Sequence, residues 1–360
     1  MTIVVYDYLR VFGGAERTLS YLLGALDDPR LIIGGQDQPD LADQWFPRVP
    51  VTDLGIRATS PVALAAKCAF QLARADLRPR ARERVVFAGA YAPIAARRIP
   101  PESQASYFCF SPPRFAYDLR NYYRGRLEFW KRPAFDLLVR YVQRQMSAGL
   151  ASIPHTITIS RAIQARVQEY TGRRSDVVYP PVEVDRFAWR PSEGYYLSTA
   201  RLEAYKNVAS IVRAFRAMPE EKLVVTSGGS QYEELVRMAE GCDNIEFTNW
   251  LEDQKLASLI ANCRATIYLP EDEDFGISPV ESLAAGKPVI GIASGGLEET
   301  LSEGKTAALI APNDVSPDRI RAAVKGMSDE VALSMKESCE RAAAPFSPDR
   351  FKLEIVRMLG

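Results

Sequence analysis

The sequence is poor in histidine, and this shortage excludes several kinds of site. The single histidine, His155, stands in IPHTITIS, where the pattern predicts the start of a strand and a structural role. One histidine argues against a Ser-His-Asp triad or a histidine-rich zinc site. The formal net charge is zero, so nothing global favours nucleic acid as a partner, and we expect none.

Paired cysteines and long apolar runs are also lacking. The five cysteines are odd in number and have no CxxC spacing, which predicts free, mostly buried thiols in a reducing compartment. The start, MTIVVYDY, is a strand-like run without a basic flank, so we expect no signal peptide. No apolar run approaches the roughly 20 residues that span a bilayer. We expect a cytoplasmic protein that is at most peripheral on the inner face of the membrane.

Short β-branched runs alternate with helical stretches along all 360 residues, which is the pattern of parallel sheets with crossover helices. The strands are predicted at 2–7, 30–35, 84–89, 106–111, 156–160, 176–180, 195–200, 222–228, 244–250, 265–270, 288–293 and 307–312. The helices are predicted at 15–26, 62–76, within 116–149, and at 207–217, 231–240, 252–261 and 279–286.

A proline-rich stretch at 179–194 predicts a linker, so we expect an α/β chain of two Rossmann-like domains. Their bounds are expected at 1–187 and 188–345, and the helix-like tail 346–360 follows. Ligands of such sheets bind beyond the carboxyl ends of the strands, so the expected site is a cleft between the domains.

Two predicted strand ends suit an anion. In VFGGAERTL, Gly13 and Gly14 open onto a helix whose N–H groups would favour a phosphate, although a plain turn is the alternative. In TARLEAYKN, Arg201 and Lys206 flank an irregular loop that ends at Asn207, an expected helix cap. Two cations there suit a diphosphate, and two ordinary surface cations are the alternative.

The stretch PEDEDFGISPVESLAAGKPV follows another predicted strand and places four acids before a lone Glu281. Three interpretations stay open. Asp272 to Asp274 resemble a metal-binding DxD only loosely. Ser278, Pro279 and Glu281 have the spacing of a capped helix start. Alternatively, Glu273 and Glu281 face one pocket and accept hydrogen bonds from the hydroxyls of a sugar.

Together, FGGAER, ARLEAYKN and EDFGISPVESLAAGKPVI resemble the retaining glycosyltransferases of family 4, which have the GT-B architecture. Glu273 and Glu281 match that family's E-x7-E pattern. The segments FSPPRFAYD and VVYPPVEVDRF resemble the bacterial branch that adds mannose or related hexoses to lipid-linked oligosaccharides.

The resemblance implies an acceptor-side first domain, a donor-side second domain and a tail helix that returns to the first. It implies that Arg201 and Lys206 hold the donor diphosphate, with the Gly13-Gly14 backbone on the same phosphates. Glu273 would bind the donor sugar and Glu281 the ribose. The sugar loop would comprise Asp274, Phe275, Gly276, Ile277 and Ser278, with the base near Trp250 and Leu251. No metal or other cofactor is expected.

One position departs from the family pattern. Many members carry a histidine in the segment matched here by CFSPPR, and it contacts the donor sugar, whereas this chain has Phe110. A hydrogen-bond donor is thereby exchanged for an aromatic ring. In the front-face retaining mechanism implied by the family, the departing phosphate takes the acceptor proton, so no side-chain base is required.

A basic segment, residues 114–144, carries a net charge of plus five and interleaved aromatic residues. It predicts either a surface that docks on anionic lipid or an ordinary solvated helix. Arg114 and Asp118 are candidate acceptor-side residues.

The hypothesis is a metal-independent retaining hexosyltransferase, with GDP-mannose the favoured donor and a lipid-linked saccharide the acceptor in polysaccharide, lipopolysaccharide or glycolipid synthesis. Another enzyme of this architecture, an epimerase or phosphorylase, is disfavoured by the single histidine. The remaining alternative is a catalytically silent nucleotide-sugar-binding subunit of a partner enzyme.

Overall fold

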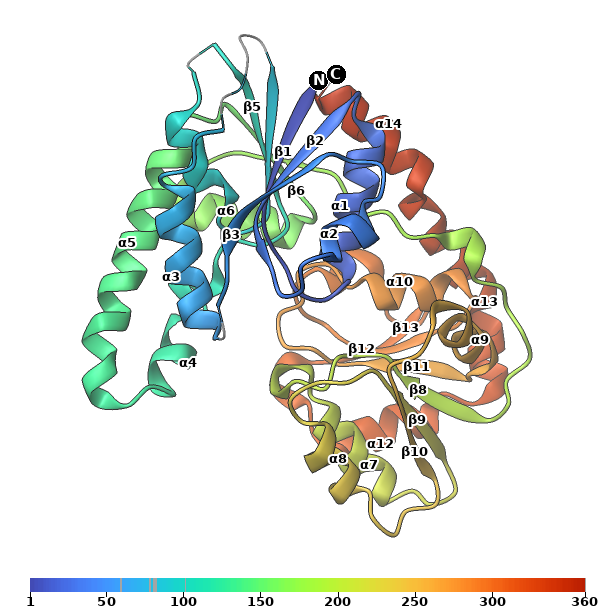
Figure 1. Cartoon of the computed structure of the whole chain (residues 1–360). Coiled ribbons are helices and arrows are strands. Elements are labelled where there is room, and N and C mark those ends of the chain that lie inside the picture. Colours follow the sequence, from blue (N-terminus) through green and yellow to red (C-terminus); the bar gives the residue numbers. More distant parts are fainter. Residues whose placement is uncertain (59, 78, 80–82, 101, 360) are drawn as a thin grey trace. The chain divides into compact units, whose positions relative to one another are not determined.

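The computed structural model describes residues 1–58, 60–77, 79, 83–100 and 102–359, which form two compact units. Unit 1 comprises residues 1–179 and 351–360, and unit 2 comprises 180–350 (Figure 1). The division falls between Tyr179 and Pro180, at the start of the proline-rich stretch. Each unit contains one parallel sheet, as the alternation of strand and helix patterns predicted.

Unit 1 is built on a seven-stranded sheet in the order β3-β2-β1-β4-β5-β6-β7, in which every described pair is parallel. The strands are β1 (Thr2–Leu9), β2 (Pro29–Gln36), β3 (Val51–Ile56), β4 (Arg84–Ala88), β5 (Gln104–Cys109), β6 (His155–Thr158) and β7 (Asp176–Val177). β3 lies at the edge and was not predicted, because Asp53 and Gly55 interrupt its apolar pattern. His155 begins β6 and pairs with Asp176 at 2.9 Å, which agrees with the expected structural role.

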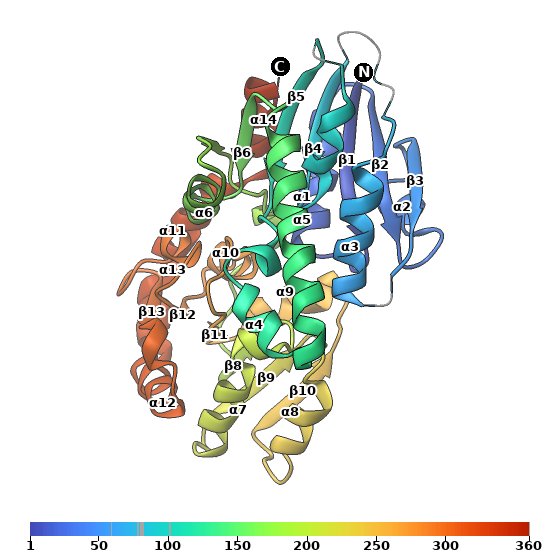
Figure 2. The same cartoon turned by 90° about the vertical axis from the view of Figure 1, so that its left-hand side faces the viewer.

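Helices cover both faces of the sheet in unit 1 (Figures 1 and 2). They are α1 (Gly14–Ala25), α2 (Leu41–Trp45), α3 (Pro61–Leu72), η1 (Ala92–Arg98), η2 (Arg114–Ala116), α4 (Arg120–Gly125), η3 (Phe129–Lys131), α5 (Arg132–Leu150) and α6 (Arg161–Thr171). Helix α14 (Pro348–Leu359) joins this unit from Phe351 onwards. The Phe351 ring is fully buried and meets the Phe108 ring edge-on at 6.1 Å between centroids, so the tail helix returns to the first unit as expected.

A buried carboxylate joins two strand ends in unit 1. Asp7 lies near the end of β1, and its side chain accepts hydrogen bonds from the N–H groups of Ala90 and Tyr91, just after β4. Gly89 between them has a φ of +112°, and a Cβ there would collide with the Asp7 carboxylate. Burial raises the pKa of Asp7 to about 7, although the backbone N–H groups oppose this rise.

Unit 2 is built on a six-stranded sheet in the order β10-β9-β8-β11-β12-β13, also parallel throughout. The strands are β8 (Tyr195–Ser198), β9 (Lys222–Thr226), β10 (Ile245–Asn249), β11 (Ala265–Tyr268), β12 (Val289–Ile292) and β13 (Ala307–Ile310). All six were predicted, and four of them are mostly buried, whereas the edge strands β10 and β13 are only partly buried.

Two helical layers cover the sheet of unit 2: α7, α8 and α12 on one face, and α9, α10 and α13 on the other (Figure 1). The bounds are η4 (Val184–Arg186), η5 (Ala204–Lys206), α7 (Val208–Arg216), α8 (Tyr232–Met238), α9 (Asp253–Asn262), α10 (Ile277–Ala284), α11 (Leu297–Thr300), η6 (Pro312–Asp314), α12 (Pro317–Gly326), α13 (Asp329–Ala343) and η7 (Ala344–Phe346). In the described part of the chain, no helix is long and apolar enough to cross a membrane.

Candidate active site

The candidate site lies in unit 2, at the edge of the sheet where its strands end. Because neighbouring strands are parallel, their carboxyl ends meet at this one edge. The loops after β8, β10 and β11 carry the predicted site residues of this unit, which are Arg201, Lys206, Trp250, Leu251, Glu273, Asp274, Phe275 and Gly276. Ile277, Ser278 and Glu281 follow on α10.

An ion pair between Lys206 and Glu273 stands at the centre of this edge. The Lys206 Nζ lies 2.5 Å from the Glu273 Oε2, and the two side chains are 10% and 17% exposed. The loops themselves are also joined, because the N–H of Glu271 donates to the carbonyl of Tyr205 at 2.8 Å. The resemblance assigned Lys206 to the diphosphate and Glu273 to the sugar of one donor molecule. In the structure these two residues contact each other directly.

Tyr268 belongs to the same cluster, and the sequence analysis missed it. Its hydroxyl donates to the Glu273 Oε2 at 3.1 Å, and its ring lies 5.6 Å from the Lys206 ammonium. Burial and the charge of Glu273 hold the pKa of the Tyr268 hydroxyl well above its ordinary value, so the hydroxyl stays protonated as a donor. Tyr268 is the last residue of β11 and is followed by the acidic loop. This position at a strand end could have identified it as a candidate site residue.

Arg201 is the open cation of the site. Its side chain is exposed, and the described residues offer its guanidinium no ion-pair partner. Burial and the charge of Glu273 raise the pKa of Tyr268, and the positive charge of Arg201 opposes this rise to a smaller extent. The Arg201 charge therefore acts on the same cluster. Arg201 is thus available to bind an added anion, whereas Lys206 already has a carboxylate partner.

The acidic loop is held by two glycines after β12. The N–H of Gly296 donates to the carbonyl oxygen of Glu273 at 2.8 Å. Gly295 has a φ of +60°, and a Cβ on either glycine would collide with the backbone of Glu273 or Asp274. Among the described residues, no three His, Cys, Asp or Glu side chains gather as a metal site requires. The loop is therefore positioned by close backbone packing.

The helix-start interpretation of Ser278, Pro279 and Glu281 is wrong. Helix α10 begins at Ile277, its N-cap is Gly276 with a φ of +90°, and no side chain caps it. Glu281 therefore lies in the second turn, too far along to complete a capping box. Ser278 instead accepts, through its carbonyl, the hydroxyl of Ser282 at 3.1 Å. Glu281 is only 5% exposed, and a carboxylate this buried is rare unless it is paired.

In the loops of the site, the side chains of Asn207 and Phe275 make contacts that the sequence did not predict. Asn207 is the N-cap of α7, but its side chain makes no cap and donates to the Leu269 carbonyl at 3.0 Å. Phe275 belongs to the expected sugar loop, and its ring is buried and meets the Phe346 ring at 5.3 Å between centroids. Both side chains thus anchor loops.

The expected base position follows β10. Trp250 is 59% exposed, and its backbone N–H donates to the side-chain oxygen of Asn249 at 2.9 Å. A Cβ on Gly228, in the loop after β9, would collide with the Trp250 indole nitrogen, so the indole lies directly over that backbone. Leu251, the next residue, is partly exposed. This turn offers an exposed aromatic face at the same edge of the sheet.

The predicted residues of unit 1 already have partners within that unit. The N–H of Gly13 donates to the Glu16 carboxylate at 3.0 Å, and Gly14 begins α1, so the expected anion donor already has an acid from its own helix. Arg114 and Asp118 form an ion pair at 2.7 Å. Phe110 is buried against the rings of Tyr6 and Phe108.

Comparisons with known proteins find similarity to glycosyltransferases. The family model described as "Glycosyl transferases group 1" matches residues 183–343. The "Alpha-1,3/1,6-mannosyltransferase alg-2" of Neurospora crassa is 27% identical over 230 residues, covering 49% of this chain and 48% of that protein. The chain thus spans about half the length of the curated relatives it matches.

Solved structures share the fold over the whole chain. The structure of Anabaena HepE in complex with UDP has a TM-score of 0.71 at 16% identity and covers 100% of this chain and 99% of that one. WaaG, a glycosyltransferase involved in lipopolysaccharide biosynthesis, has a TM-score of 0.71 at 15% identity and covers 98% and 99%. As the resemblance implied, residues 183–343 match the model of the glycosyl transferases group 1, and the whole chain has the fold of these GT-B structures.

Proposed function

We propose that the protein is a retaining hexosyltransferase that moves a hexose from a nucleoside-diphosphate sugar to a lipid-linked saccharide acceptor. The observation that carries the proposal is the Lys206–Glu273 ion pair, which stands with the open Arg201 at the carboxyl edge of the sheet. Phosphate oxygens need cations, and sugar hydroxyls need acceptors. This edge supplies both within one cluster.

The roles of the residues follow from their chemistry. Arg201 and Lys206 would take the diphosphate and stabilise the charge that grows on it as the bond from the sugar's anomeric carbon to the phosphate oxygen breaks. The acceptor oxygen would bond to the same face of that carbon and give its proton to the departing phosphate. Glu273 would accept from the sugar hydroxyls, Glu281 from the ribose, and Trp250 would lie beside the base.

GDP-mannose is the donor we favour. The support is that the curated relative named above, the Neurospora crassa protein, is a mannosyltransferase by name. The structural neighbour HepE was solved with UDP, so the base is the part of the donor that an experiment must decide.

The test is a thermal-shift panel of GDP, UDP, ADP and dTDP sugars, each with and without EDTA. A ligand at 100 times its Kd stabilises a protein by roughly 2.7 kcal/mol, so one nucleotide family is expected to raise the Tm. The rise should be indifferent to EDTA and smaller in Glu281→Ala. Glu271→Ala is the matched control, because Glu271 is exposed on the same loop and its hydrogen bond uses only the backbone. A panel without any shift would contradict the proposal.

A silent nucleotide-sugar-binding subunit is the second candidate, and Phe110 favours it. Its ring is buried among aromatic side chains and offers no hydrogen bond. Hydrolysis of the stabilising donor in the absence of acceptor separates the two candidates. Measurable release of nucleoside diphosphate supports the transferase, whereas binding without release supports the silent subunit.

We also propose that the basic segment, residues 114–144, docks on anionic lipid. Two of its aromatic residues lie outside the core, because Phe129 is 80% exposed and Trp130 is 61% exposed, whereas Phe135 is buried. Lys131 lies 4.6 Å from the Trp130 ring centroid, and Arg140 and Arg144 are exposed. Exposed aromatic rings beside cations suit the headgroup region of a membrane.

Co-sedimentation with vesicles tests this surface. We expect binding to vesicles that contain 30% anionic lipid to exceed binding to neutral vesicles, and high salt to reduce it. Exchanging Phe129 and Trp130 together for serine should weaken it at least tenfold, because two large rings no longer enter the interface. Phe70→Ser is the control, since Phe70 is 51% exposed but outside the segment. Equal loss in the control would show that the segment has no special role.

A further inference from the structure

Unit 2 contains a cavity at the opposite edge of its sheet from the candidate active site. It has a volume of about 260 Å³. Arg264 immediately precedes β11 and Lys287 precedes β12 by two residues, so the cavity lies at the amino ends of the strands whose carboxyl ends carry the acidic loop and its glycines. The lining residues are Trp189, Pro191, Ser192, Arg264, Gly286, Lys287, Asp329, Ala332 and Leu333.

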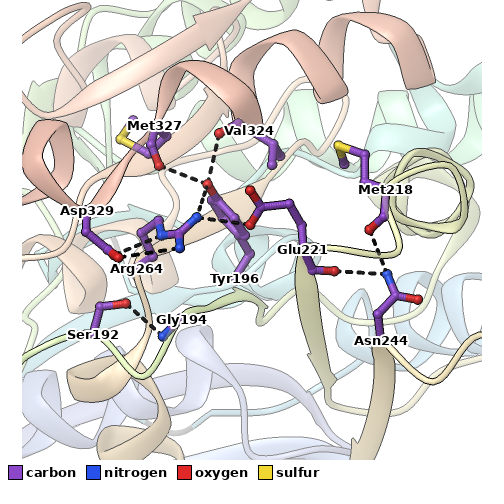
Figure 3. A network of polar contacts seen from close by, with 10 residues as sticks. All are labelled: Ser192, Gly194, Tyr196, Met218, Glu221, Asn244, Arg264, Val324, Met327 and Asp329. Carbon is purple, nitrogen blue, oxygen red and sulfur yellow. Dashed lines mark hydrogen bonds and ion pairs between the residues drawn. The ribbon is translucent and has the colours of Figure 1, made fainter.

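The two cations of this cavity differ in how well they are paired. Figure 3 shows the Arg264 guanidinium enclosed by acceptors. It donates to Asp329 at 2.8 Å and to Glu221 at 3.0 Å, and a further bond reaches the Tyr196 hydroxyl at 3.2 Å. Its charge is therefore balanced by two carboxylates, and the carboxylate of Asp329 is already engaged.

Lys287 has no such balance. It is 3% exposed, and its ammonium donates to the carbonyl of Arg190 at 2.7 Å, which is the one hydrogen-bond acceptor that the described residues give it. An ammonium has three N–H donors, so two remain for something else. Burial lowers the pKa of Lys287, and this effect is larger than the opposing effect of the Asp329 charge.

The walls around Lys287 are mostly apolar. The Trp189 ring lies with its centroid 5.3 Å from the ammonium, and Leu333 is 54% exposed at the rim. The floor is fixed, because Gly286 has a φ of +66° and a Cβ there would press on Lys336 and Trp189. A single unbalanced cation among apolar groups suits a ligand with one negative charge and an apolar body.

We propose that this cavity is a binding site for a small organic carboxylate. The carboxylate accepts the two open N–H groups of Lys287, and the apolar body lies against Trp189 and Leu333. A phosphate dianion fits less well, because it brings two charges to one unbalanced cation and leaves the apolar walls uncovered. The site is separate from the donor site, so a nucleotide sugar does not compete for it.

Isothermal titration calorimetry with the full chain, at pH 7 and constant ionic strength, tests the proposal with benzoate, acetate and inorganic phosphate. We expect benzoate to bind one to one, more tightly than acetate or phosphate, and with unchanged affinity when a nucleotide sugar is present. Lys287→Met should weaken benzoate binding at least tenfold. Lys336→Met is the matched control: this lysine also lies near the Trp189 ring but is paired with Glu340, so its loss should change the affinity less than threefold.

A chemical footprint keeps the test valid if Lys287→Met does not fold. In the wild-type protein, reductive methylation followed by mass spectrometry should modify Lys287 less when benzoate is present, and Lys336 equally with and without it. The proposal is overturned if benzoate gives no binding heat, if it leaves Lys287 unprotected, or if a folded Lys287→Met variant binds it as wild type does.

Discussion

Exchange of Lys206 for methionine is expected to lower the rate of hexose transfer by roughly 10²- to 10³-fold. Loss of one positioned group that stabilises developing charge has this size of effect, because nothing mobile replaces it in the transition state. The exchange should also cost stability, by up to about 3 kcal/mol, since it leaves the mostly buried carboxylate of Glu273 without its cation. Initial rates with the donor identified by the panel and urea unfolding measure the two effects.

The double variant separates catalysis from folding. Glu273→Gln in the Lys206→Met background removes the unpaired charge, while the amide oxygen can still accept from Tyr268, so most of the lost stability should return. The transfer rate should not return, because the phosphate still lacks its cation. Recovery of the rate together with the stability would mean that Lys206 acts only by holding the loop.

The second large effect concerns Asp7 and pH. Its pKa is about 7 in the fold, and an aspartate in an unfolded chain has a pKa of about 3.9. Between these values the folded protein binds a proton that the unfolded chain does not. The free energy of unfolding should therefore fall as pH rises from 4 towards 7, by as much as about 4 kcal/mol from this one group, and the extra stability is fully present only below pH 4.

Urea unfolding at several pH values from 4 to 8 measures this dependence in wild type and Asp7→Asn. Asparagine keeps an acceptor oxygen for the N–H groups of Ala90 and Tyr91 but does not ionise in this range. As pH rises, the free energy of unfolding of wild type should therefore fall steadily relative to that of Asp7→Asn. Asp27→Asn, at an exposed position, should leave the wild-type slope unchanged. Parallel pH profiles for wild type and Asp7→Asn would refute the assignment.

Much of the fold and the position of the site followed from local patterns in the sequence. Most strands of unit 2 are short and buried on both faces, so their ends could be located to within a few residues, and the site residues lie directly after those ends. The edge strand β3 was not predicted, because Asp53 and Gly55 interrupt its apolar pattern and only Ile56 is buried. The edge strand β10 is also only partly buried, but its residues Ile245–Phe247 alternate between apolar and polar, which is the pattern of a strand with one covered face.

The side-chain partners could not be derived in the same way. Lys206 and Glu273 are 67 residues apart, and their contact depends on how two loops pack. Helix α10 begins at Ile277, after Gly276, and the loop before it is held by Gly295 and Gly296. Ser278-Pro279 has the spacing of a helix start, but that local pattern carries no information on this contact between distant loops. Gly13 was likewise expected to serve a phosphate, whereas Glu16, one turn along the same helix, accepts its N–H.

The return of α14 to unit 1 has a consequence for the order in which the protein is made. Residues 1–179 leave the ribosome first, but Phe351, Ile355 and Leu359 are buried in that unit and emerge only at the end of the described chain. Part of the core of unit 1 therefore stays uncovered until the whole of unit 2 has been synthesised. The half that is translated first is completed last, and a nascent chain interrupted before Phe351 would leave an intact unit 2 beside an unfinished unit 1.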